Sequence, residues 1–222
     1  MTPAANRSAF NSPATVQALK FWQDAIKEGV APRDELGFGA NDPVANLAGG
    51  YCAIQNLGIW GISLLRQQAK GFAYGVFPCP IPPIGKPKTV LGGWAFVANA
   101  QGKDPETAAQ FCVWALGSMS DDSVRRVANW STKAKAEIPP RKSAMAIATA
   151  EGVYDAGPIK IFKDEIFPTG RAETRLPPKI YKAVSDAIQA CQLGGADPER
   201  QAAEASQNID AYLAGYTGAP IR

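Results

Sequence analysis

Four dipeptides, each a Ser or Asp followed by Pro, constrain the fold of this chain most strongly. They are Ser12-Pro13, Asp42-Pro43, Asp104-Pro105 and Asp197-Pro198. A Ser or Asp side chain can accept a hydrogen bond from the first free amides of a helix, and proline is well tolerated at the first helical position. Together with apolar stripes at helical spacing, they make helices dominant. We expect helices over 13–28, 42–48, from about 59 onward, 104–117, 120–129, 143–151, 156–166, 178–192 and 198–214.

Fewer segments read as strands. We expect strands at 51–56, 72–77 and 90–98, the second of them ended by a proline-rich loop. The last of the three ends in Ala95-Phe96-Val97-Ala98, which is apolar on both faces and is typical of a strand covered on both sides. The fold class predicted from the pattern is therefore α/β with helices in the majority.

Composition excludes several classes of function. The 222 residues carry a net charge of +3, with Lys and Arg scattered rather than clustered, so no nucleic-acid partner is expected. No run of 18 apolar residues could span a membrane. The first residues lack a basic region followed by an apolar core, so they do not read as a signal peptide.

Signs of catalysis or of a metal site are missing from the sequence. The chain has no histidine, which removes the commonest general base and metal ligand. Asp164 and Glu165 are adjacent, and neighbouring residues of a helix do not face each other, so we interpret them as a solvated face. We expect no cofactor and no metal. The cysteines form no C-x-x-C pair and are expected mostly as buried thiols, with one or two disulfides left open; they are Cys52, Cys79, Cys112 and Cys191.

Tryptophan beside glycine recurs at the ends of predicted elements. Trp60 lies between Gly58 and Gly61, and Trp94 follows Gly92-Gly93. A flat ring beside bare backbone suits the face of a sugar, while backbone groups reach its hydroxyls. Burial in the core is the competing interpretation. By itself it is favoured for both tryptophans, and more strongly for Trp22, Trp114 and Trp130.

The order of several segments resembles the carboxyl-terminal part of family 1 extracellular solute-binding proteins of ABC transporters, the group that includes maltose-binding protein. The segments that carry the resemblance are "FNSPATVQALKFWQDAIKEGVAP", "LAGGYCAIQNLGIWGISLL", "YGVFPCPIPPIG", "LGGWAFVANAQGKDPETAAQFCVWALGS" and "IPPRKSA", followed by the closing helices. No single segment is decisive, but together they cover nearly the whole chain in the family's order.

The resemblance implies a two-lobe fold of the periplasmic binding protein type II, with most of the amino-terminal lobe absent from this sequence. Residues 1–90 would begin the carboxyl-terminal lobe, residues 91–138 would hold a hinge strand and helices of the partial amino-terminal lobe, and residues 139–222 would return. With the resemblance included, Trp94 is expected in the cleft between the lobes rather than in the core. The implied ligand contacts are Trp60, Gly93, Trp94 and Arg171, the last with a fork of donors that suits neighbouring hydroxyls.

The implied function is that of a non-enzymatic, periplasmic component of an ABC importer, monomeric at full length. Its partners would be a carbohydrate and the importer's membrane permease subunits. Two alternatives remain open. The same fold could take a polyamine, a phosphodiester or another small polar solute, or the chain could be an enzyme with a pair of carboxylates in one pocket.

Overall fold

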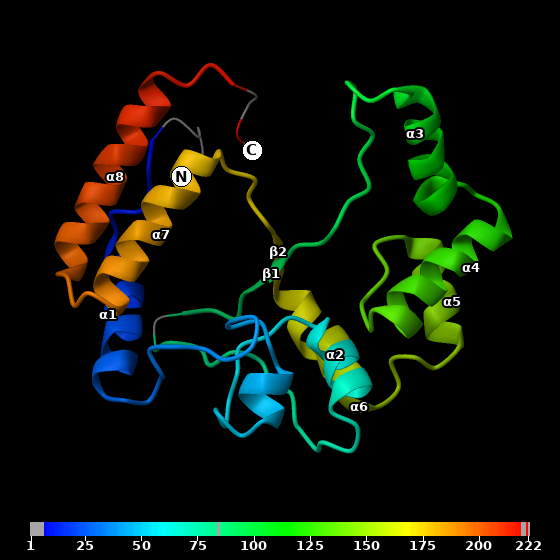
Figure 1. Cartoon of the computed structure of the whole chain (residues 1–222), viewed down its shortest axis with the longest axis horizontal. Helices are drawn as coiled ribbons and strands as arrows, with labels where there is room; N and C mark the ends of the chain where they lie inside the picture. Colours follow the sequence, from blue (N-terminus) through cyan, green and yellow to red (C-terminus); the bar gives the residue numbers. More distant parts are fainter. Residues whose placement is uncertain (1–6, 84, 219–220, 222) are drawn as a thin grey trace. The chain divides into compact units, whose positions relative to one another are not determined.

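A computed structural model describes residues 7–83, 85–218 and 221. The chain divides into two compact units. The first joins Met1–Glu35 to Thr174–Arg222, and the second is the intervening Leu36–Glu173 (Figure 1). The predicted lobe boundaries at 90 and 138 do not coincide with these units and stay a prediction about the family's two-lobe fold.

The first unit consists of three packed helices, α1 (Pro13–Lys27), α7 (Pro178–Gln192) and α8 (Pro198–Ala214). Two of them begin at the predicted caps. The Ser12 side chain accepts a hydrogen bond from the Thr15 amide, and the Asp197 side chain accepts one from the Arg200 amide at 2.8 Å. The three predicted helix ranges are confirmed to within one residue.

The core of the first unit lies where the apolar stripes of these helices meet. Leu19 of α1, Cys191 of α7 and Ala202 of α8 are all buried in one cluster. The Gln23 side chain donates hydrogen bonds to the backbone oxygens of Cys191 and Ala196, at 3.2 and 2.8 Å. Polar and apolar contacts thus join α1 to a helix more than 150 residues later in the chain.

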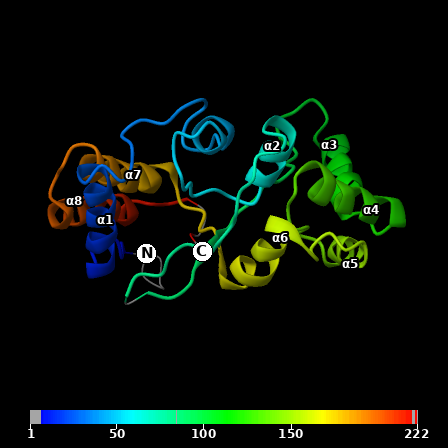
Figure 2. The same ribbon diagram turned by 90° about the horizontal axis from the view of Figure 1, so that it is seen from below.

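The second unit contains shorter elements, joined by longer irregular segments (Figure 2). Its α-helices are α2 (Gly61–Gln68), α3 (Pro105–Cys112), α4 (Asp121–Asn129), α5 (Lys142–Ala150) and α6 (Gly157–Ile161). Wider π-helical turns are η1 (Val44–Ala48), η2 (Val113–Gly117), η3 (Trp130–Ala134) and η4 (Phe162–Ile166), and η5 (Phe167–Thr169) is a 3-10 turn. The helices predicted at 104–117, 120–129, 143–151 and 156–166 are confirmed, with several of them ending in π-helical turns. The helix predicted at 42–48 is only the short π-helical turn η1.

Two small cores hold the second unit together. In one, Ile62 of α2 packs with Tyr154 and with Ile159 of α6. In the other, Val124 and Val127 of α4 pack with a buried alanine of α5, which lies beside α4 in Figure 2.

A short parallel pair of strands joins distant parts of the second unit. β1 (Thr89–Leu91) pairs with β2 (Gly170–Ala172), with Val90 opposite Arg171. A Cβ atom on Gly170 would lie 2.4 Å from Cγ of Leu91. Glycine at position 170 is therefore what lets the two strands approach each other.

The strand predictions were largely wrong. Residues 51–56 and 72–77 form no strand, and the segment predicted at 90–98 is a strand only to Leu91. Val97 is 83% exposed rather than covered on both sides. A strand depends on hydrogen bonds to a neighbouring strand, and the residues described here provide none for these segments. β2, conversely, was missed because the sequence around it reads as a break between helices.

Among residues 7–83, 85–218 and 221, no helix combines the length and apolar character needed to cross a membrane.

Candidate functional site

The pairing of β1 with β2 brings together two of the predicted site segments. Arg171 lies opposite Val90, and the Glu173 amide donates a hydrogen bond to the Leu91 oxygen at 3.2 Å. Gly92-Gly93-Trp94 continues the chain from that point. Residues about 80 positions apart in the sequence thus meet at one end of the strand pair. We call this end the strand-pair site: Gly92, Gly93, Trp94, Arg171 and Glu173.

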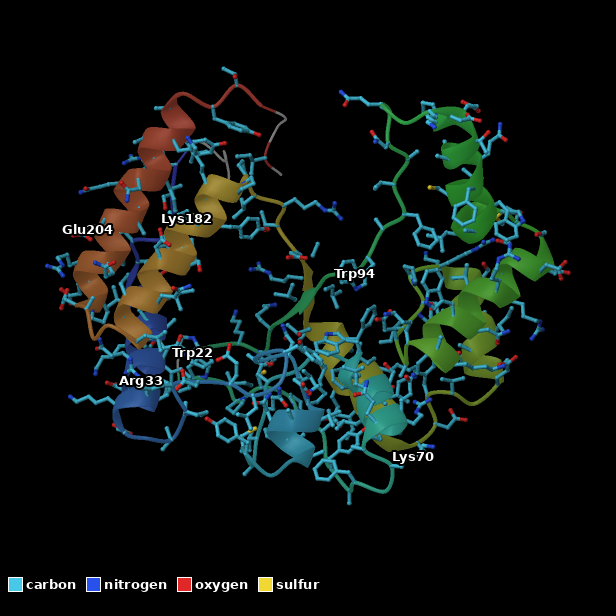
Figure 3. The ribbon with its side chains drawn as sticks, in the orientation of Figure 1. Trp22, Arg33, Lys70, Trp94, Lys182 and Glu204 are labelled. Carbon is cyan, nitrogen blue, oxygen red and sulfur yellow. The ribbon has the colours of Figure 1, made fainter. Side chains whose placement is uncertain are left out.

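Trp94 is the most exposed large apolar side chain of the described residues, at 92% of its surface. Figure 3 shows it on the segment that leaves β1. Burial in the core is therefore excluded for Trp94 within its unit. An exposed indole offers a flat apolar face that a ligand can cover.

Gly93 leaves the backbone bare beside this ring. A Cβ atom at position 93 would meet no described atom within 4 Å, and Gly93 is not among the glycines with a positive φ. Neither a close approach nor a left-handed backbone therefore accounts for this glycine. What it provides is open access to the peptide groups next to Trp94.

Two exposed charged residues follow from the register, Arg171 opposite Val90 and Glu173 beside Gly92. Arg171 supplies hydrogen-bond donors only, whereas a Glu173 carboxylate supplies acceptors. Oε2 of Glu173 lies 3.0 Å from where a Cβ atom on Gly92 would be, so its carboxylate covers that glycine. Sequence reasoning missed Glu173, because only the register of β1 with β2 reveals that it lies beside Gly92.

Trp60 lies at the start of α2 and is half-buried. Its ring covers Gly58, since a Cβ atom there would come within 2.4 Å of the indole Nε1. The Ser63 hydroxyl donates a hydrogen bond to the Trp60 oxygen at 2.8 Å. No contact recorded among the described residues joins Trp60 to Trp94 or Arg171, so its place in the site stays a prediction.

A comparison with protein families decides what kind of protein carries this geometry. The model of a family described as "Bacterial extracellular solute-binding protein" matches residues 2–158. The chain belongs to the bacterial extracellular solute-binding proteins. The resemblance stated from the sequence is thereby confirmed at the level of the family.

A curated relative and several solved structures agree with this family. A "Probable ABC transporter-binding protein" of Deinococcus radiodurans is 32% identical over 114 residues, which are 49% of this chain and 26% of that protein. An ABC transporter solute-binding protein of Thermotoga lettingae, solved with α-D-tagatose, matches with a TM-score of 0.72 and 24% identity, over 96% of this chain and 52% of its own. A cyclic α-maltosyl-1,6-maltose binding protein of Arthrobacter globiformis matches with a TM-score of 0.62 and 21% identity, over 96% and 51%.

These structural matches show a shared fold and confirm the predicted solute-binding architecture. The chain spans about half the length of the solved proteins that it matches.

The remaining tryptophans of this family member are not core residues. Trp22, Trp114 and Trp130 are 41%, 54% and 39% exposed, so the prediction of core packing was wrong. Trp114 instead carries the Arg126 guanidinium, 4.0 Å above its ring. An apolar stripe predicts which side of a helix faces a neighbour, but it does not predict how much of each ring that neighbour covers.

The adjacent carboxylates are surface groups, as predicted. Asp164 accepts hydrogen bonds from Lys160 and, at 2.9 Å, from Lys163. The hydrogen bond from Lys160, followed by that from Lys163, lowers the pKa of Asp164 below its usual value. A carboxylate that serves as a general acid needs a raised pKa, so Asp164 has the opposite property.

The four cysteines differ in their exposure. All four cysteines are free, and Cys191 alone is buried, whereas Cys79 is exposed, so the expectation of mostly buried thiols was wrong. Burial raises the pKa of Cys191. Within the part of the chain that the structure describes, no group of His, Cys, Asp or Glu side chains could hold a metal ion.

One hollow of the second unit begins at Ala95, directly after Trp94. It is an open groove of about 500 Å³ between the Ala95–Val97 segment and α3, and its lining is mainly apolar. None of Trp60, Trp94 and Arg171 lines it.

Proposed function

We propose that this protein is the solute-binding component of an ABC importer and that its solute is a carbohydrate. The observation that carries the proposal is the strand-pair site. An almost fully exposed indole lies beside bare backbone, with Arg171 on the paired strand and Glu173 directly after it. Of the solved proteins with this fold, one is bound to α-D-tagatose and another is a cyclic α-maltosyl-1,6-maltose binding protein.

Each side chain has a definite role in this proposal. The apolar C–H face of a sugar ring stacks on Trp94, and peptide groups at Gly93 reach a hydroxyl without a side chain in the way. The fork of Arg171 donates to neighbouring hydroxyls, while Glu173 accepts from them. In this proposal Trp60 is a second aromatic residue that contacts the sugar. This role is implied by the resemblance to the family and not by any contact between Trp60 and Trp94.

No catalysis follows from binding of this kind. The partners in the proposal are the membrane permease subunits of the importer, and the location is the periplasm, as the family description and the transporter relative both favour. The strand-pair site combines a single cation with a single carboxylate. A neutral polyol therefore matches it better than a polyamine, which needs several acidic groups, or a phosphodiester, which needs several basic ones.

The test is a titration of the 222-residue chain with monosaccharides and disaccharides, followed by the indole N–H signals in NMR spectra. Because the site covers only one side of a ligand and bound ligands are usually 70–90% buried, we expect dissociation constants of about a millimolar or weaker. The Trp94 signal should shift most.

Trp94→Ala should weaken the affinity by roughly 5- to 150-fold, which corresponds to about 1–3 kcal/mol. Trp22→Ala is the matched control, since Trp22 is also exposed but belongs to the first unit. Equal losses in the two variants, or shifts confined to other tryptophans, would remove the strand-pair site from the proposal.

A further inference from the structure

Glu137 is a half-buried carboxylate of the second unit that lies outside the strand-pair site. No hydrogen bond or ion pair of its side chain joins it to another of the described residues. Burial raises the pKa of Glu137, and the charge of Lys135 only partly opposes that shift. The carboxylate is therefore partly withdrawn from water without gaining a partner in the described part of the chain.

Another carboxylate of the same unit shows what a withdrawn carboxylate normally needs. Asp42 is 7% exposed and accepts hydrogen bonds from the amides of Phe38, Val44 and Ala45. Removing a charge from water costs free energy unless hydrogen bonds replace the lost hydration. Glu137 lacks this compensation, so the stability of the fold does not account for a carboxylate at this position.

The backbone next to Glu137 is held in an uncommon conformation. Ala136 is completely buried, has a φ of 53°, and is the only residue other than glycine with a positive φ among those that the structure describes. The Glu137 amide donates a hydrogen bond to the Ser131 oxygen at 2.7 Å, and its own oxygen accepts one from the Tyr154 hydroxyl at 3.3 Å. A left-handed residue with a Cβ atom persists only where its surroundings enforce it, and such residues cluster at binding sites. These contacts fix the point from which the Glu137 side chain projects.

The segment around Glu137 shares a small core with the segment around Trp60. Ala136 is buried in this core, and Ile59 and Ile138 both pack against it. Trp60 follows Ile59 and Glu137 precedes Ile138, so both residues lie at the border of the same core. Each is half-buried, which leaves part of an indole ring and part of a carboxylate open to a ligand.

We propose that Glu137 is a ligand-binding residue whose carboxylate accepts hydrogen bonds from hydroxyl groups of the solute. The proposal rests on the carbohydrate function proposed above and adds a residue outside the strand-pair site. An ionised carboxylate only accepts hydrogen bonds, and its bonds to hydroxyl groups are short and strong. A sugar hydroxyl supplies the missing partner while the sugar ring covers Trp60. Such a site selects for a hydroxyl, because a solute without one would leave the carboxylate unpaired.

The experiment titrates the intact 222-residue chain with D-tagatose and with maltose, and follows the indole N–H signals of Trp60 and Trp94 in NMR spectra. Glu137→Ala should weaken the affinity by about tenfold. Glu137→Gln should weaken it by about threefold, because an amide oxygen still accepts a hydrogen bond but carries no charge. Glu165→Gln is the matched control at an exposed carboxylate of η4, and it should leave the affinity unchanged.

Unfolding in urea separates this role from a structural one. Because the carboxylate has no recorded partner, Glu137→Gln should leave the urea midpoint unchanged or raise it. A lowered midpoint would refute the proposal, since the carboxylate would then stabilise the fold. Unchanged affinity of Glu137→Ala, with the Trp94 signal still shifting, would refute it as well and would leave the carbohydrate function intact. If neither tryptophan signal of the unaltered chain shifts with sugar, the carbohydrate function fails together with this inference.

Spermidine is a further probe, since ammonium groups also pair with carboxylates. We expect it to bind no more tightly than either sugar. Tighter binding of spermidine that is lost in Glu137→Gln would identify an amine as the partner of Glu137 and would contradict the assignment of a hydroxyl.

Discussion

Both units of this chain contain amphipathic helices, but their apolar stripes are covered to different extents. In the first unit the apolar stripes of α1, α7 and α8 close on one another around Leu19 and Cys191. In the second unit, α3 leaves its Phe111 half exposed beside the ring of Phe96. The comparison teaches that an amphipathic stripe predicts that a neighbour exists, whereas only the structure shows whether the chain itself supplies that neighbour.

The largest difference in stability is expected when one apolar side chain is removed from each unit, one from a closed core and one from an exposed surface. Leu19→Ala should lower the free energy of unfolding by about 2–5 kcal/mol, because it leaves a cavity in a closed core. Phe111→Ala should lower it by only about 1 kcal/mol, because about half of the phenylalanine side chain is already exposed. Urea denaturation measures both values. A large cost for Phe111→Ala would show that α3 is packed in solution.

Within the second unit, two glycine substitutions compare a strand-paired segment with an unpaired one. Gly170→Ala should cost about 1–3 kcal/mol, because the added Cβ would overlap the Leu91 side chain across the strand pair. Gly93→Ala adds a Cβ atom into open space and should stabilise the chain by about 0.4–1 kcal/mol through the unfolded state. Thermal unfolding of the two variants compares them. A loss of stability in Gly93→Ala would mean that the segment after β1 is more constrained than described.

The buried tyrosine of the second unit tests whether its small core is as closed as that of the first. Burial raises the pKa of Tyr154 to about 12, above its ordinary value of about 10. The stabilising contribution of this group is therefore complete below about pH 10 and is lost as the pH rises from 10 to 12. Tyr154→Phe should remove that part of the pH dependence, and should cost about 0.5–1.5 kcal/mol at pH 7 through the hydrogen bond to the Glu137 oxygen. Identical pH profiles for the two proteins from 10 to 12 would contradict a closed core.

The smallest effect is expected at the surface of the first unit. Lys182 and Asp186 form an exposed ion pair along α7, at 2.7 Å (Figure 3 labels Lys182). Lys182→Ala should cost no more than about 0.5 kcal/mol, and less in 1 M salt, because exposed pairs are weak and screened. Chemical denaturation at two salt concentrations gives the value. If Lys182→Ala lowered the free energy of unfolding by more than about 1 kcal/mol, Lys182 would have to make contacts other than this ion pair.

Helices were predictable from this sequence and strands were not. A helix satisfies its own backbone, so local features such as the Ser12 and Asp197 caps are enough to place it. A strand is defined by a distant partner, and nothing near residue 72 or residue 170 in the sequence states whether a partner exists. The same limit applies to the site. Gly93 and Trp94 could be proposed from their local pattern, whereas Glu173 required the register of β1 with β2.

The contact of α1 with α7 has a consequence for biosynthesis. About 150 residues separate the end of α1 from the start of α7. At a translation rate of about 5–20 residues per second, α1 leaves the ribosome roughly 8–30 s before the helix that covers Leu19 exists. Throughout that interval the apolar stripe of α1 is open to chaperones and to other nascent chains. The earliest helix of the chain is therefore among the last to reach its native packing.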